Sequence, residues 1–88
     1  LNPNERVAAY LLKVVKTEGK EREDGVSIGV VANDVVANVG LDLLRVESVL
    51  KNMEKAKVIQ RFEGGMKLRS AQLLERYIAH IKKAGRSR

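Results

Sequence analysis

The sequence lacks cysteine and tryptophan, and it contains a single histidine. Without thiols there can be no disulfide bond and no thiolate metal site. With only three aromatic residues, the chain offers no platform on which the bases of single-stranded nucleic acid would stack. His80 has no second histidine and no suitably spaced carboxylate beside it, so we interpret it as a surface or interface residue. We therefore predict no enzymatic activity, no catalytic residue, no metal site and no cofactor.

Long hydrophobic runs are also missing. The most apolar region, residues 26–44, is interrupted by two asparagines and two aspartates and is unsuited to crossing a bilayer. A chain of 88 residues has room for one small core, and a hydrophobic content of 44% is typical of a folded protein. We expect one domain over residues 1–88, cytoplasmic and nucleoid-associated, with no membrane partner and no small-molecule ligand.

Positive charge is concentrated in the second half of the chain. Residues 1–44 contain five lysines and arginines against seven acidic residues, a net charge of −2. Residues 45–88 contain twelve against four, a net charge of +8. A basic face on a small domain favours nucleic acid as the partner, because each neutralised phosphate releases condensed counterions. The alternative is a lysine-rich surface that only keeps the protein in solution.

The first third of the chain contains one clear helix. An asparagine cap, a proline at the first helical position and a glutamate three residues after the cap predict a helix over residues 3–18. Gly19 is a suitable stop. The mixed charges of residues 20–24 predict an exposed loop. Residues 25–28 predict a short strand that joins a later hairpin in a three-stranded sheet, because an isolated hairpin is only marginally stable.

Residues 29–57 predict two helices joined by a tight turn. Valines recur every four residues from Val31 to Val39, which favours a helix although valine weakly prefers strands. Gly40 is a suitable stop, and Asp42 is a suitable N-cap for the following helix. The apolar face of that second helix is formed by Val46, Val49, Leu50 and Met53. Two helices joined by a short turn containing glycine form a helix-turn-helix.

A hairpin and a last helix complete the predicted elements. After residue 57 the period of the apolar residues changes from about 3.6 to about 2, which predicts strands. Gly64 and Gly65 lie between the two strand-like segments and supply the positive φ that a tight turn needs. We predict the hairpin over residues 58–69. Ser70 is a suitable cap for a helix over residues 70–84 with a broad apolar stripe.

This order of elements resembles the winged helix-turn-helix superfamily over nearly the whole chain. Residues 34–41 are similar to that family's second helix with its glycine turn, and Val46, Leu50 and Met53 match buried positions of its third, recognition helix. Residues 61–69 match the wing. The resemblance implies an α+β, mainly α fold with a three-helix core, a small antiparallel hairpin wing and an extra C-terminal helix. It implies binding of double-stranded DNA by a small transcription regulator or chromatin-type protein.

The outward positions of the third helix and the wing carry the expected contacts to DNA. Arg45 and Asn52 have the geometry to hydrogen-bond guanine and adenine edges. The other positions suit phosphate contacts. The predicted DNA-binding residues are Arg45, Ser48, Lys51, Asn52, Lys55, Arg61, Lys67 and Arg69. Alternatively, the helix lysines pair with Glu47 and Glu54, and the stem of Arg61 only covers the sheet.

The apolar stripe of the last helix predicts a homodimer. Its expected interface residues are Leu73, Leu74, Tyr77, Ile78 and Ile81. The alternative is that this stripe packs onto the first helix of the same chain.

Two features of the third helix favour a different function. Leu43 and Leu44 open the helix where a DNA reader often carries polar groups, and Glu47 would repel phosphates. These residues are compatible with a winged helix that serves as a protein-interaction module of a larger assembly.

Overall fold

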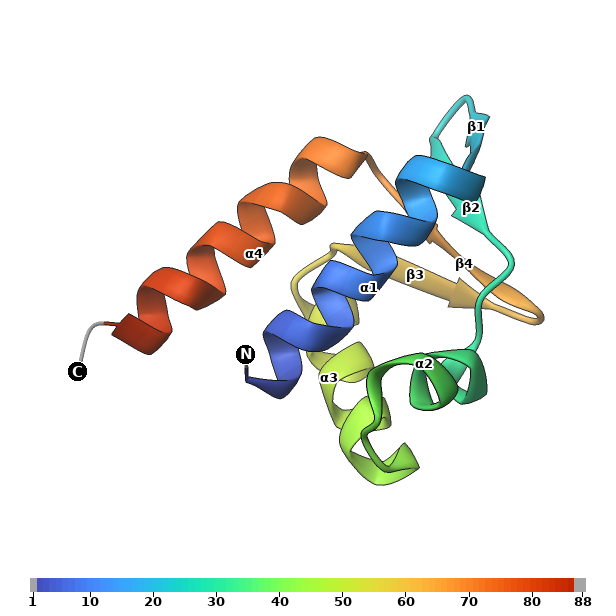
Figure 1. The fold of residues 1–88 in the computed structure, drawn as a ribbon. Coiled ribbons are helices and arrows are strands. Elements are labelled where there is room, and N and C mark those ends of the chain that lie inside the picture. Colours follow the sequence, from blue (N-terminus) through green and yellow to red (C-terminus); the bar gives the residue numbers. More distant parts are fainter. Residues whose placement is uncertain (1, 87–88) are drawn as a thin grey trace.

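The computed structural model describes residues 2–86, which form four helices and four strands. The elements are α1 (Pro3–Glu18), β1 (Lys20–Arg22), β2 (Gly25–Ile28), α2 (Ala32–Val39), α3 (Leu43–Lys55), β3 (Ile59–Phe62), β4 (Gly65–Leu68) and α4 (Ala71–Arg86) (Figure 1). The helix-turn-helix of α2 and α3, the hairpin wing of β3 and β4 and the additional helix α4 confirm the predicted winged-helix fold.

The sheet is antiparallel and has the strand order β1-β2-β4-β3. The prediction of a three-stranded sheet, with residues 20–24 in a loop, was wrong because Lys20–Arg22 pairs with β2 through a two-residue turn. All three residues of β1 are exposed, and the strand is held by backbone pairing along one edge. A strand with no buried side chain has no apolar alternation, so its sequence carries no strand signal.

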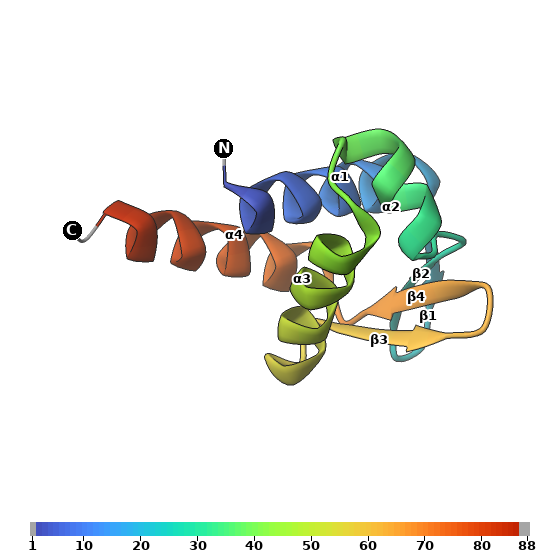
Figure 2. The same ribbon diagram turned by 90° about the horizontal axis from the view of Figure 1, so that it is seen from below.

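Helix α1 lies at the centre of the fold. It contacts α2, α3, α4 and β2, and in both ribbon views it runs antiparallel to α4 (Figures 1 and 2). The largest side chains with less than 2% exposure are Leu11, Leu50, Met53, Met66, Leu68 and Leu74. These residues come from α1, α3, α4 and the wing, so the core fixes the position of α3 relative to the wing.

The turn between α2 and α3 is held by one backbone conformation and two hydrogen bonds. Gly40 adopts a left-handed backbone with φ 71°, which costs a residue without Cβ little. The guanidinium of Arg6 on α1 donates to the carbonyl of Val39 at the end of α2. The amide of Arg45 donates to the Asp42 carboxylate at 2.8 Å, which confirms the predicted cap of α3. The start and direction of α3 are therefore fixed on both sides of the turn.

Helix α2 begins at Ala32, three residues later than the predicted start. The amide of Val31 donates to the Asp34 carboxylate at 2.9 Å, so the aspartate closes the first turn. Val30, just before it, is buried in the core. The segment that links the sheet to the helix therefore buries Val30 and is extended at Val31.

Helix α3 ends in a Schellman motif that has a lysine at the left-handed position. The amide of Val58 donates to the carbonyl of Met53, and the amide of Lys57 donates to that of Glu54, both at 3.0 Å. Lys57 has φ 63° and is the only non-glycine residue with positive φ among residues 2–86. Glycine is the usual residue here because a Cβ is strained in this conformation.

The turn of the wing uses its two glycines differently. Only Gly64 has a positive φ, of 87°, so the expectation that both glycines supply it was half right. Gly65 is buried, and a Cβ there would lie 3.0 Å from the Phe62 ring and against the carbonyl of Ile28. The first glycine therefore permits the turn, and the second permits close approach of β2.

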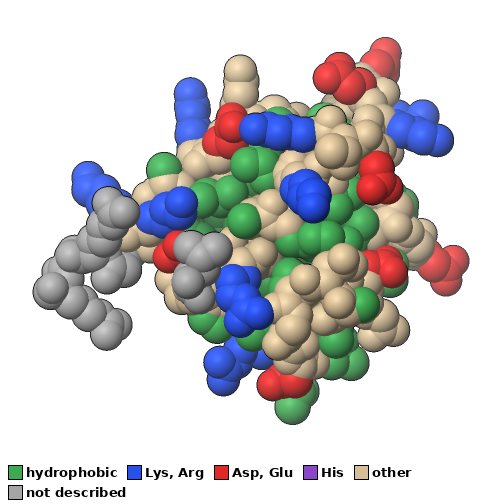
Figure 3. All heavy atoms as spheres, viewed as in Figure 1, with side chains coloured by type: hydrophobic (Ala, Val, Ile, Leu, Met, Phe, Trp, Pro, Cys, Tyr) green, Lys and Arg blue, Asp and Glu red, His purple; other side chains and the backbone are tan. Residues whose placement is uncertain are grey.

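Helix α4 starts at the predicted cap, with the amide of Leu73 donating to the Ser70 hydroxyl at 3.0 Å. It runs to Arg86, two residues further than predicted, and its last turns extend past the start of α1 (Figure 2). Hydrophobic side chains are visible in the valley between α1 and α4 (Figure 3). No helix within residues 2–86 is long and apolar enough to span a membrane.

Candidate nucleic-acid interface

The outward line of α3 is formed by Leu44, Ser48, Lys51 and Lys55, which are all exposed. Their spacing of three and four residues places them on one side of the helix, opposite the buried face. Arg45 and Asn52, also exposed, lie along one flank of this line. The structure therefore brings the five helix residues predicted to bind DNA onto one solvent-facing surface.

The basic side chains on this surface are available to a ligand. Among the described residues, none forms an ion pair with Arg45, Lys51 or Lys55. The alternative in which Lys51 and Lys55 pair with Glu47 and Glu54 is not observed. Both glutamates bind another residue instead.

Arg61 on β3 binds both of these glutamates and joins the wing to α3. Its Nη2 donates to Glu47 Oε1 at 2.9 Å, and its Nε donates to Glu54 Oε1 at 3.2 Å. The Arg61 side chain is only 26% exposed. The hydrogen bond from Arg61 lowers the pKa of Glu47, and the bond to Glu47 raises the pKa of Arg61. Contact of Arg61 with DNA stays a prediction, and it would require breaking these pairs.

Lys67 on β4 lies on the other face of the sheet. The register pairs it with Gln60 and Ser27, whereas Arg61 pairs with Met66, so Arg61 and Lys67 point to opposite sides. The ammonium of Lys67 donates to the carboxylate of Asp24 in the β1–β2 turn. This bond lowers the pKa of Asp24. The two wing cations therefore do not form one surface with the exposed line of α3.

A groove at the C-terminal end of α3 contains two further basic residues. It is lined by Asp24, Glu54, Lys57, Val58, Ile59, Gln60, Lys67, Leu68 and Arg69. Lys57 and Arg69 are exposed and form no ion pair with a described residue. Arg69 is among the residues predicted to bind DNA, whereas Lys57 is not. The one sequence signal for Lys57 is that a lysine, and not a glycine, stands where the chain must turn from α3 into β3.

The flank of α3 that faces the wing is apolar at its start. Leu43 is 47% exposed and Phe62 is 51% exposed, and both line a shallow hollow above the Glu47–Arg61 pair. The rest of the lining comes from the start of α2 and from Gly65. Leu43 was singled out from the sequence but Phe62 was not, because the contribution of Phe62 to the hollow depends on how the end of β3 packs beside α3.

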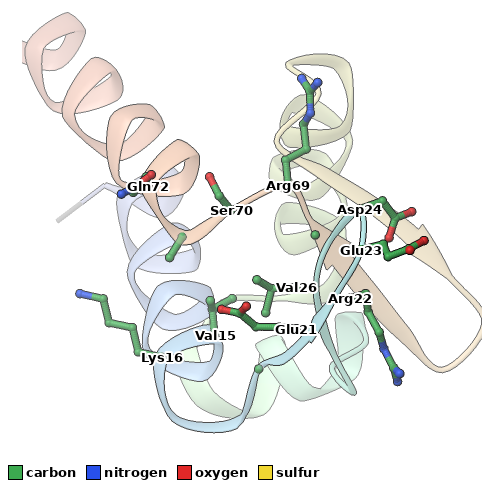
Figure 4. Close-up of a pocket in the computed structure, with 13 residues that line it drawn as sticks. Val15, Lys16, Glu21, Arg22, Glu23, Asp24, Val26, Arg69, Ser70 and Gln72 are labelled. Atoms are coloured by element: carbon green, nitrogen blue, oxygen red, sulfur yellow. The ribbon is translucent and has the colours of Figure 1, made fainter.

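A separate cavity lies between the end of α1, the β1–β2 hairpin and the start of α4 (Figure 4). Glu21 points toward Val15 and Val26, whereas Arg22 and Arg69 point away. The lining mixes both charges, and within the described part of the chain no cluster of histidine and carboxylate side chains could hold a metal. Apart from Arg69, the cavity contains none of the predicted site residues.

The predicted dimer interface on α4 is divided by the structure. Leu74 is 0% exposed and belongs to the core beside α1, so it has no surface left for a partner and the prediction for this residue was wrong. Tyr77, Ile78 and Ile81 are partly buried against the same core, and burial raises the pKa of Tyr77. Leu73 is half-buried at the edge of the stripe.

A three-helix core with a helix-turn-helix, a β-hairpin wing and an exposed third helix defines the winged helix-turn-helix class. Similar folds occur in a CRP/FNR family transcriptional regulator from Thermus thermophilus (TM-score 0.76, 23% identity, 86% of this chain and 40% of that chain). They also occur in the CO-dependent transcription factor CooA from Carboxydothermus hydrogenoformans (TM-score 0.79, 16% identity, 88% and 37%).

CprK in complex with OCPA is a third solved structure with this fold (TM-score 0.75, 15% identity, 88% of this chain and 36% of that chain). The chain thus spans 36–40% of the length of these proteins. No protein-family model and no curated protein sequence matches the chain. At such low identities the similarity establishes the fold, and two of the proteins that share it are transcription regulators rather than enzymes.

Proposed function

We propose that this domain binds double-stranded DNA through the outward line of α3. The observation that supports this function best is the exposed row of Ser48, Lys51 and Lys55 on the third helix of a winged helix, whose two lysines form no ion pair with a described carboxylate. A helix of this kind enters the major groove with its N-terminal residues at the base edges. The row is then directed at the duplex.

The outward residues divide into two roles by position. Near the start of α3, Arg45 and Ser48 are within reach of base edges, and Arg45 can form two hydrogen bonds to guanine. Further along, Asn52 lies at the boundary, and Lys51 and Lys55 neutralise phosphates. Phosphate contacts set the affinity and the position on the duplex, whereas the base contacts set the sequence preference.

The wing supports this binding in a different way from that implied by its sequence. Arg61 fixes the angle between the wing and α3 through Glu47 and Glu54, so it acts as a positioning residue. Lys57 and Arg69 line the groove at the C-terminal end of α3 and add positive charge that forms no ion pair with a described residue. The proposed cationic surface therefore includes Lys57 and Arg69 of this groove, but not Lys67, which also lines the groove and is paired with Asp24.

A salt titration on duplex DNA tests this function. Fluorescence anisotropy with a labelled random duplex at about 50 mM salt should show binding, because nonspecific phosphate contacts are strongest at low salt. If Lys51, Lys55, Lys57 and Arg69 each contact one phosphate, the logarithm of the association constant should fall with log salt with a slope of about −3.6. A single strand of the same length is the comparison probe, and we expect a shallower slope on it. Absence of any binding at low salt would contradict the function.

The second candidate is a protein-interaction module, favoured by Leu43 and Phe62 beside the apolar hollow. Contiguous exposed apolar surface is one mark of a protein-interaction site, and these two side chains from separate elements line the same hollow. In that case the domain would bind no random duplex at low salt, and Phe62→Ser, at an exposed position, would leave its folding unchanged. The same titration therefore separates the two functions.

A homodimer through α4 is part of the proposed function. The last turns of α4 extend beyond α1. Along the helix, Leu73, Tyr77, Ile78 and Ile81 are only partly buried and keep some exposed surface. Two domains joined in this way would present two copies of α3 to one duplex and act as a transcription regulator on the cytoplasmic nucleoid. Sedimentation equilibrium should show a dimer that Ile81→Lys dissociates. A monomer at every concentration would rule the dimer out.

A further inference from the structure

Leu44 is the most exposed of the large hydrophobic side chains described, with 85% of its surface open to solvent. It lies in the first turn of α3, at the head of the line that continues through Ser48 and Lys51. The two other exposed large hydrophobic residues, Leu43 and Phe62, lie beside the hollow on the wing flank instead. Leu44 is therefore the one large hydrophobic side chain on the outward line of α3, at the N-terminal end of the proposed DNA-binding surface.

A leucine at this position has only one favourable contact in the major groove. The base edges there present hydrogen-bond donors and acceptors, which an alkyl side chain would desolvate without replacing their bonds. The single apolar group on these edges is the C5-methyl of thymine. Because N-terminal residues of a recognition helix approach base edges, Leu44 is at the depth where that methyl group lies.

We propose that Leu44 reads thymine, by packing against its C5-methyl group in the major groove. This inference rests on the proposed function of α3 and names a feature of the DNA it prefers. The surroundings of Leu44 favour a duplex over an apolar protein partner, because Lys51 and Lys55 continue the same line and Arg45 flanks it, all without ion pairs to described residues. Clustered unpaired cations are complementary to phosphates.

The test compares duplexes that differ only in the methyl group. Alternating dA–dT duplex of about 20 base pairs, or two helical turns, is measured against alternating dA–dU duplex of the same length. Uracil keeps the hydrogen-bond pattern of thymine. We expect the parent protein to bind the dA–dT duplex about fourfold more tightly per contacted methyl group, the factor for burying one such group. A second pair, dG–dC and dG–5-methyl-dC, should show the same direction.

Matched variants assign the effect to the side chain. Leu44→Ala should bring the ratio of the dA–dT and dA–dU affinities close to one, and Leu44→Gln, which keeps the length but is polar, should do the same. Leu43→Ala is the control, because Leu43 lies on the other flank, and its ratio should equal that of the parent. Circular dichroism checks folding, which the exposed position of Leu44 should leave unchanged.

Two outcomes would overturn the inference while the proposed function stands. One is salt-dependent duplex binding with equal affinity for dA–dT and dA–dU. The other is a methyl preference that Leu44→Ala leaves intact. Failure to bind any duplex would instead overturn the proposed function itself, and it would assign Leu44 to a protein contact.

Discussion

Helix α3 and the wing carry the same types of basic side chain, but they present them differently. On α3, Lys51 and Lys55 face solvent and form no ion pair with described residues. On the wing, Arg61 binds two glutamates of α3 and Lys67 binds Asp24. A cation that is already paired must lose its partner before it can neutralise a phosphate, so its contribution to binding is reduced. The two regions therefore differ in whether their cations are already paired, and not in the type of residue, which is why the proposed binding surface lies on α3.

The largest effect is expected from the helix lysines. In Lys51→Ala/Lys55→Ala, each lost phosphate contact should make the salt slope shallower by about 0.9. One phosphate contact strengthens binding roughly eightfold when the salt falls from 1 M to 0.1 M. Loss of two contacts should therefore weaken binding about 60-fold at 0.1 M salt. The matched control is Lys13→Ala/Lys82→Ala, which removes the same charge from α1 and α4. Equal losses in both variants would show that only net charge matters.

Lys57→Gly should move stability and binding in opposite directions. Glycine removes the strain of a Cβ at φ 63°, so the free energy of unfolding should rise by about 1 kcal/mol. The same change removes an exposed cation beside the end of α3, so the salt slope should become shallower by about 0.9. Urea denaturation and anisotropy measure the two quantities. Lys57→Ala, which keeps the strain, is the control for the loss of charge alone.

Arg61→Gln should lower stability without changing the salt slope. The substitution leaves Glu47 and Glu54 without their partner, which should cost about 1 kcal/mol in the free energy of unfolding, because partial exposure of all three side chains weakens the pairs. Arg61→Lys keeps the charge but not the two-pronged geometry, and it should recover only part of the loss. A slope shallower by about 0.9 in Arg61→Gln would instead make Arg61 a phosphate contact.

The smallest expected effect is a pH dependence of the same pair. Arg61 lowers the pKa of Glu47 from its ordinary 4.5, so the unfolded chain binds the proton first as the pH falls. The stability that the pair contributes is fully present above pH 4.5 and is lost as the pH falls through the lower folded pKa. Glu47→Gln should therefore lose less stability than the parent below pH 4.5. If the free energies of unfolding of the two proteins fall in parallel with pH, the Glu47–Arg61 pair does not contribute to the pH dependence of stability.

Local signals in the sequence were enough to predict most of the fold. The cap of α1 by Asn2, the left-handed Gly40, the cap of α3 by Asp42 and the positive φ of Gly64 all depend on residues within a few positions. The exposed line of α3 also follows from helical periodicity. These features could be predicted because neighbouring residues alone determine them.

Contacts between distant residues could not be predicted in the same way. Glu47 and Arg61 are fourteen residues apart, and Asp24 and Lys67 are forty-three apart. Their pairing depends on the packing of α3 on the wing and on the β1–β2 turn, which itself has no apolar signal. The burial of Leu74 likewise depends on where α1 lies. The basic residues of the predicted site could therefore be named from the sequence, but which of them are free of ion pairs could not.

The most direct test of the central claim is an NMR titration of the ¹⁵N-labelled chain with a random duplex at low salt. We predict that the amides of α3 from Leu44 to Lys55, together with Lys57, shift in proportion to the bound fraction. The amides of β1 and of Asp24, behind the wing, should keep their positions. Shifts confined to the wing or to α4, with α3 unchanged, would contradict the proposed binding surface.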